Sequence, residues 1–130
     1  MENICAICHA DPSSHSFSKM YKTDNTTVFY TCPANATKYY DTAGIINHYD
    51  AMLRENGDGQ WIWVFDSKGF GIKHMLELNT GIEIAKLITQ KYSKTLKKIK
   101  VINPTWYIFM AYNTIKFFLS EELRSIIDFD

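Results

Sequence analysis

One stretch of the chain, residues 99 to 119 (IKVINPTWYIFMAYNTIKFFL), constrains the possible folds more than any other. It begins with a β-branched run that is too short for a helix and therefore predicts a strand. Asn103-Pro104 ends this strand, because proline has no backbone N–H for the sheet and pushes the residue before it into extended geometry.

The rest of the stretch predicts a helix that is apolar on nearly every side. Its apolar residues recur at helical spacing and cover most of the remaining circumference, so that only Asn113, Thr114 and Lys116 supply a polar face. Such a helix needs cover on both sides. We expect protein on one side, and a lipid, a membrane or a partner protein on the other.

The composition suits one globular domain, since 130 residues can bury a working core without a metal or a disulfide. Lys plus Arg and Asp plus Glu number 14 each, and the resulting zero net charge argues against a nucleic-acid partner. No apolar run reaches the roughly 20 residues of a membrane span. The first residues, Met1-Glu2-Asn3, do not read as a signal peptide, so we expect a soluble protein of the cytoplasm.

Strand and helix patterns alternate after a loop-rich lead-in at residues 1–26. The expected strands are 27–32, 61–66, 99–102 and 126–129, and the expected helices are 41–56, 75–92, 104–119 and a short one after Ser120. This order indicates an α/β fold, with a mostly parallel central sheet and flanking helices, in a single domain over residues 27–130. The run WIWVFD at 61–66 does not alternate, which predicts a middle strand covered on both faces.

Several of these segments together resemble the CRAL-TRIO lipid-binding domain. The similar segments are TVFYTCPANATKYYD, WIWVFDSKGFG, QKYSKTLKKI, KVINP and IKFFLSEELRSII, which together cover about residues 27 to 130. The chain departs from the family pattern in two places: it has no N-terminal helical bundle, and it stops before a further strand and a Gly-Gly segment. For that reason no headgroup specificity is carried over from the resemblance.

The resemblance implies that the apolar helix at 104–119 is a lid over a hydrophobic pocket on the sheet. The function it implies is non-enzymatic: a carrier or sensor that holds a hydrophobic molecule such as a phospholipid and touches membranes transiently. The candidate lipid-binding residues are Trp63, Phe65, Val101, Trp106, Phe109, Met110, Asn113 and Phe117. The alternative is a protein-interaction or scaffold module that uses the lid region for a partner or for self-association.

Pocket volume separates these two hypotheses, because rings such as Trp63, Phe65 and Phe109 would exclude a lipid if they filled the space. A strand that begins at Ile126, close to the last residue, predicts an unpaired sheet edge. We therefore expect a homodimer formed through the C-terminal third of the chain.

Cys5-Ala-Ile-Cys8-His9 has the spacing of a covalent haem attachment site, although no export signal or haem pocket accompanies it. Zinc is the stronger alternative, with His9, His15 or Cys32 completing a tetrahedron begun by the two thiols. Reduced thiols without a metal are the simplest interpretation, so we expect no cofactor and no metal.

Two patterns suggest catalysis or nucleotide binding without completing either. Asp66 ends a predicted central strand and His74 follows it, but no nucleophile elbow accompanies them, and a turn cap is the simpler role for Asp66. Gly69-Phe70-Gly71 lacks the third glycine of a dinucleotide fingerprint and indicates a tight turn. We expect no enzyme activity.

Lysines cluster between the second long helix and the strand at 99–102. The five are Lys91, Lys94, Lys97, Lys98 and Lys100. They fit either contact with acidic lipid headgroups beside the lid or a solvated helix end and sheet edge.

Overall fold

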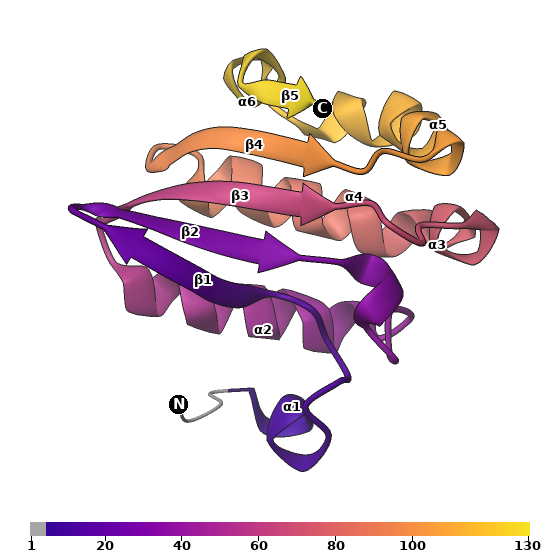
Figure 1. Ribbon diagram of the computed structural model, residues 1–130, viewed down its shortest axis with the longest axis horizontal. Helices are drawn as coiled ribbons and strands as arrows, with labels where there is room; N and C mark the ends of the chain where they lie inside the picture. The colour runs from indigo at the N-terminus through magenta and orange to yellow at the C-terminus, as the bar shows by residue number, and fades with distance from the viewer. Residues whose placement is uncertain (1–4) are drawn as a thin grey trace.

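The structure is a computed structural model and describes residues 5–130 (Figure 1). Its elements follow in chain order. They are α1 (Ala6–Ala10), β1 (Ser18–Thr23), β2 (Thr26–Thr31), η1 (Pro33–Asn35), α2 (Thr42–Asn56), β3 (Gln60–Asp66), α3 (Ile72–Leu76), α4 (Leu78–Leu87), η2 (Ile88–Tyr92), β4 (Leu96–Ile102), α5 (Trp106–Ile115), η3 (Lys116–Phe118), α6 (Glu121–Ser125) and β5 (Ile127–Phe129).

The five strands form one sheet in the order β1-β2-β3-β4-β5. β1 and β2 are antiparallel, and every later pair is parallel. The predicted α/β fold with a mostly parallel sheet is confirmed, and β3 is its middle strand. None of the helices in the described part of the chain is long and apolar enough to cross a bilayer.

The two long helices α2 and α4 pack on one face of the sheet. Parallel strands in sequential order, joined by right-handed crossovers, place successive helices on the same side, and Figure 1 shows α2 and α4 together behind the strands. Trp61 and Trp63 of β3 face these helices and are 1% and 6% exposed.

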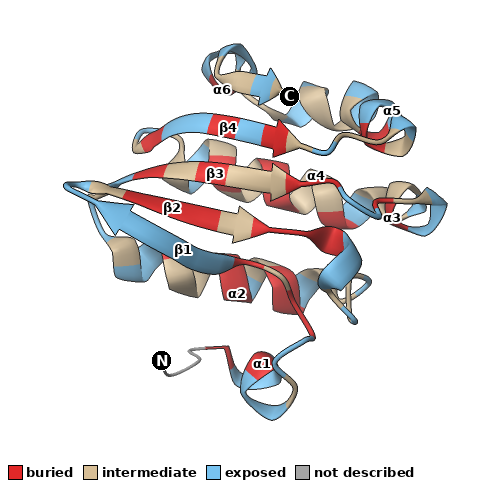
Figure 2. Ribbon diagram, viewed as in Figure 1, coloured by how far each residue is buried: buried red, intermediate tan, exposed pale blue. Residues whose placement is uncertain are grey.

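The opposite face of the sheet is only partly covered at β3, which corrects the expectation that this strand is covered on both sides. Val28, Ile62 and Lys98 are register partners on this face, and Ile62 is only half-buried while Lys98 is exposed. Figure 2 shows exposed stretches along β1 and β4. A non-alternating apolar run therefore does not require a second covering layer here.

β1 lies in the lead-in that the sequence predicted to be loop-rich. All six of its residues are exposed, so no alternation of apolar and polar residues marks it in the sequence. The chain turns back into β2 at Asp24, whose φ of 49° lies in the left-handed region. The strand before this turn was missed.

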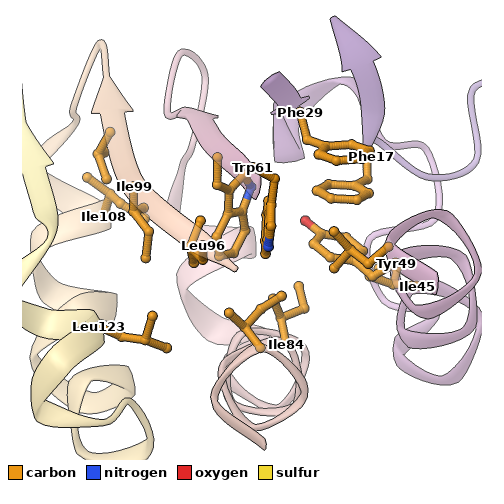
Figure 3. Close-up of a cluster of buried hydrophobic side chains, with 14 of the residues drawn as sticks. Phe17, Phe29, Ile45, Tyr49, Trp61, Ile84, Leu96, Ile99, Ile108 and Leu123 are labelled. Carbon is orange, nitrogen blue, oxygen red and sulfur yellow. The ribbon is translucent and has the colours of Figure 1, made fainter. Parts of the chain in front are cut away.

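Stacked aromatic rings build the core between the sheet and α2 (Figure 3). Phe17 lies between Phe29 and Tyr49, with ring centroids 5.0 and 4.0 Å away. Trp61 meets Phe29 edge-on at 5.7 Å. Burial of such side chains stabilises the fold by about 1.5–3 kcal/mol each, and Phe17 brings the lead-in into the core.

Local capping explains where two predicted helices begin. The Asp41 carboxylate accepts a hydrogen bond from the Gly44 N–H at 3.2 Å at the start of α2. Ser120 Oγ accepts one from the Leu123 N–H at 3.3 Å at the start of α6. Both residues supply the side-chain oxygens that the exposed N–H groups of a first turn require.

Candidate ligand-binding site

An apolar cavity of about 100 Å³ lies between the covered face of the sheet, α4 and α5. The strands contribute Trp63, Phe65 and Val101 to its wall, and α4 contributes Ile84 and Ala85. Sheet residues two apart in β3 point to the same face, which is why Trp63 and Phe65 both reach it.

No charged side chain is among the described residues that line the cavity. Its tyrosines, Tyr39 and Tyr112, are the side chains in its lining that can ionise. Burial raises the pKa of Tyr39, and the nearby Glu77 raises it further. Burial also raises the pKa of Tyr112, against an opposing effect from Arg124. Both phenols therefore stay neutral, and the cavity favours an uncharged apolar group.

Trp63, which lines the cavity, carries a polar atom that is unpaired in the described part of the chain. Its side chain is 6% exposed, and its Nε1 has no hydrogen-bond partner among the described residues. A buried N–H without an acceptor is unfavourable by about 1–3 kcal/mol.

Three of the predicted binding residues, Trp63, Phe65 and Val101, line the cavity. The five predicted from the lid helix do not. Trp106 and Phe117 are 69% and 73% exposed. Phe109, Met110 and Asn113 are also exposed.

The inner face of the lid is formed by Ile108, Tyr112 and Ile115 instead. A helix that is apolar all round has no polar stripe to fix its rotation, so its sequence alone could not tell which side faces the sheet. The predicted inner face is corrected accordingly, while ligand binding by any of these residues remains a prediction.

Specific contacts hold the lid in place. Asn103, with φ 50°, turns the chain out of β4, and Thr105 Oγ1 donates a hydrogen bond to the Phe70 carbonyl at 2.9 Å. Along the helix, the Phe109 ring lies 5.0 Å from that of Phe129. These contacts add to the burial of Ile108 and Ala111 of α5 in the hydrophobic core.

The outer side of the lid presents an apolar surface. We call it the aromatic patch and define it by Trp106, Phe109, Met110 and Phe117 of α5 and η3. Ile72 and Leu76 of α3, an element that contacts α5, are likewise 56% and 70% exposed. Exposed apolar side chains grouped in this way mark a surface for a membrane or a partner.

Asp66 has a local structural role. Its carboxylate accepts hydrogen bonds from Tyr30 Oη at 2.5 Å, the Lys68 N–H at 3.0 Å and Asn103 Nδ2 at 3.1 Å. Burial alone would raise the pKa of Asp66, but these hydrogen bonds outweigh it and lower the pKa.

His74 is likewise engaged locally, because its Nδ1 accepts from the Gly71 N–H at 3.0 Å at the start of α3. Between Asp66 and α3, Gly69 has φ 79°, and a Cβ there would lie 2.8 Å from Ala34 Cβ. The segment is the tight strand-to-helix turn that the sequence indicated.

The lysine cluster is spread over two surfaces. Lys91 Nζ donates to Asp50 at 3.0 Å, and Lys98 Nζ lies 3.6 Å from a carboxylate oxygen of Asp128. Lys97 and Lys100 are exposed along β4. None of these side chains lines the cavity.

The cysteines divide into two sites. Cys32 is buried, and its Sγ donates to the Lys68 carbonyl at 3.6 Å. Cys5 and Cys8 lie in the lead-in, where they are buried together beside His15. His9, the third member of the C-x-x-C-H spacing, is exposed.

Comparison with known proteins identifies the family to which this fold belongs. The chain belongs to the CRAL/TRIO domain family, whose family model matches residues 35–130. A solved structure described as the crystal structure of Sfh5 shares the fold with a TM-score of 0.72 at 13% sequence identity. The match covers 91% of this chain and 49% of that one, so the chain spans about half the length of that protein. A search of curated proteins finds no match to the sequence.

The resemblance inferred from the sequence is therefore confirmed. Domains of this family bind lipids or other small hydrophobic ligands, and they are in general non-enzymatic lipid-transfer proteins.

Proposed function

We propose that this chain binds one hydrophobic molecule, a lipid with an acyl chain, in the cavity beneath α5 and exchanges it by opening that helix. The uncharged cavity between sheet and lid is the observation that supports the proposal most directly. No bond is made or broken, so the chain acts as a carrier or a sensor.

The cavity is too small to hold a lipid chain unless the lid moves. Pockets for ligands of ordinary size measure roughly 300–1,000 Å³, whereas this cavity measures about 100 Å³. A lipid chain enters only if α5 moves away from the sheet. Each methylene transferred from water contributes about 0.8 kcal/mol, so ten would contribute about 8 kcal/mol toward holding the lid open around the chain.

The aromatic patch supplies the contact at which a ligand is exchanged. Its side chains lie on the outer side of the same helix that closes the cavity. Insertion of these side chains into a bilayer surface would bury them and pull α5 outward in one step. We infer transient membrane contact through this patch.

The test separates the cavity from the patch with two sets of variants. Ala85→Leu fills the cavity from α4, and Trp106→Asp with Phe117→Asp adds charge to the patch. The readouts are the displacement of a fluorescent fatty acid in solution and sedimentation with phosphatidylcholine vesicles. Glu83→Gln, on the outer side of α4, is the matched control.

We expect Ala85→Leu to weaken fatty-acid binding at least tenfold without affecting vesicle sedimentation. The variant that combines Trp106→Asp and Phe117→Asp should sediment less with vesicles and should keep the fatty-acid affinity of the wild type. Native mass spectrometry of protein purified from cells should show a bound lipid in the wild type and none in Ala85→Leu. Equal fatty-acid affinity in Ala85→Leu and Glu83→Gln would contradict the assignment of the cavity.

A further inference from the structure

A second cluster, remote from the lid, gathers four side chains that commonly bind metal ions. Cys5 immediately precedes α1 and Cys8 lies within it, His15 comes from the loop before β1, and His48 from α2. All four are buried, and their potential ligand atoms lie within 4.8 Å of one another. We call these residues the Cys-His cluster.

The distances match those around a tetrahedral ion. Cys8 Sγ lies 3.4 Å from His15 Nδ1 and 3.6 Å from His48 Nδ1, and Cys5 Sγ lies 3.5 Å from His15 Nδ1. With Zn–S of about 2.3 Å and Zn–N of about 2.0–2.1 Å, a tetrahedron places its sulfur and nitrogen ligands about 3.6 Å apart.

Hydrogen bonds orient both imidazoles for metal binding. His48 Nε2 lies 2.7 Å from the Phe17 carbonyl, which can only accept, so this nitrogen carries the proton and Nδ1 presents its lone pair to Cys8. His15 Nε2 donates in the same way to the Asp41 carboxylate at 3.0 Å. Carboxylate and carbonyl partners of this kind accompany metal-bound histidines because they fix the ring and its tautomer.

Hydrogen bonding within the cluster explains the arrangement less well than a metal ion. His15 Nδ1 has one lone pair and two sulfurs within 3.5 Å, so Cys5 can donate to it while Cys8 donates to His48 Nδ1 at 3.6 Å, and hydrogen bonding gives each thiol one long contact. A thiol is also a weak donor. A cation at the centre would be bound by two thiolates and two imidazoles simultaneously.

The position of α1 is a second observation that favours a bound metal ion. α1 has five residues, and Cys8 is its buried side chain. A helix this short is not stable alone in water, and in Figure 1 it lies beyond α2, away from the sheet. Little apolar burial is available to fix it there, whereas a metal bound to Cys8 and His48 would attach it directly to α2.

We propose that Cys5, Cys8, His15 and His48 form a structural zinc site that fastens α1 to α2. Two thiolates and two imidazoles in a tetrahedron favour zinc over the harder divalent cations. Four protein ligands close the coordination sphere, so the ion has no open position for catalysis. Binding releases the two thiol protons to solvent. The simpler interpretation of the sequence, reduced thiols without a metal, is replaced by this proposal.

The first measurement uses the unmodified chain, purified without chelators and dialysed. Elemental analysis should find one zinc per chain, and removal of that zinc should lower the thermal midpoint. Titration of the metal-free, reduced chain with Co²⁺ should produce a thiolate-to-cobalt charge-transfer band and strong tetrahedral d–d absorption. A chain that binds no zinc, or that gives only the weak bands of octahedral cobalt, would overturn the proposal.

Variants then identify the ligands. Cys8→Ser and His48→Gln should abolish stoichiometric zinc. His9→Gln, beside the cluster, and Cys32→Ser, a buried cysteine outside it, should retain one zinc per chain. Asp41→Asn keeps all four ligands and should weaken zinc binding about 10- to 100-fold, which gives a readout even if the ligand variants fail to fold. Zinc that is retained in His48→Gln, or that is lost in His9→Gln as in Cys8→Ser, would overturn this set of ligands.

Discussion

Asp66 shows how much a single side chain can connect in this fold. Its carboxylate joins β2 through Tyr30, the turn after β3 through the Lys68 N–H, and the end of β4 through Asn103. Asp66 is 8% exposed, so these hydrogen bonds to an ionised group are shielded from water and stabilise the fold.

We predict that Asp66→Asn lowers the free energy of unfolding by about 2 kcal/mol at neutral pH, because hydrogen bonds to a charged group contribute about 1.5–3 kcal/mol. The folded-state pKa of Asp66 lies below its ordinary value. Its stabilising effect is therefore fully present above the unfolded-state pKa and is lost as the pH falls through the folded-state pKa.

Urea unfolding of the wild type and of Asp66→Asn at a series of pH values from 7 to 3 checks this prediction. The difference between the two should shrink toward the acid end. Asp58→Asn, at an exposed turn position, is the control and should track the wild type throughout. A difference for Asp66→Asn that is constant with pH would show that its ionisation does not matter.

Single residues also show where sequence reasoning reached its limit. The turn-cap role of Asp66 could be predicted, because Lys68 is its close neighbour in the chain, whereas its contacts with Tyr30 and Asn103 could not. His48 could not be assigned to the Cys-His cluster, because it lies 40 residues from Cys8 and spacing carries no information about such a contact. The available signal was a histidine between Ile45 and Tyr49 on the inner stripe of α2.

At the scale of elements, α4 and α5 approach each other at Gly81. A Cβ placed there would lie 2.5 Å from Ile115 Cδ1, which is too close for two carbon atoms. The glycine therefore sets how far the lid settles onto α4, at a position where alanine would otherwise favour the helix by about 1 kcal/mol.

We predict that Gly81→Ala gains no stability in the native background, because displacement of Ile115 cancels the helix propensity of alanine. In an Ile115→Val background the clashing Cδ1 is absent, and the same substitution should raise the free energy of unfolding by about 1 kcal/mol. Chemical denaturation of the four variants in a double-mutant cycle measures the coupling. Equal effects in both backgrounds would mean that the two helices are not in contact at Gly81.

Most strands and helices could be predicted, since their periodicity is local. β1 was missed because none of its six residues is buried. The helix expected at 75–92 is divided into α3, α4 and a π-helical turn. The rotation of α5 was misassigned because contacts with the sheet, rather than its own polarity, decide which side faces inward.

For the molecule as a whole, self-association remains a prediction. β5 pairs with β4 on one side and is the last strand in the sheet order, so its other side presents N–H and C=O groups to which a second copy can bind. We predict a dimer at high protein concentration, formed by pairing of these edges or by exchange of α5.

Light scattering over a concentration series checks the dimer. The Trp106→Asp and Phe117→Asp double variant should dimerise like the wild type, because it leaves β5 and the buried face of α5 unchanged. A wild-type chain that stays monomeric would refute the prediction, and a dimer that dissociates in the double variant would move the interface to the aromatic patch.

The sequential strand order has a consequence for the time course of folding. From β2 onward each strand pairs with the strand made just before it, so the sheet can grow in the order of synthesis, one crossover connection at a time. All four members of the Cys-His cluster lie within the first 48 residues, before β3 begins. The cavity takes lining residues from Tyr39 to Phe129, so it closes only when the last strand is in place. A nascent chain would thus secure its N-terminal end long before it has any space for a ligand.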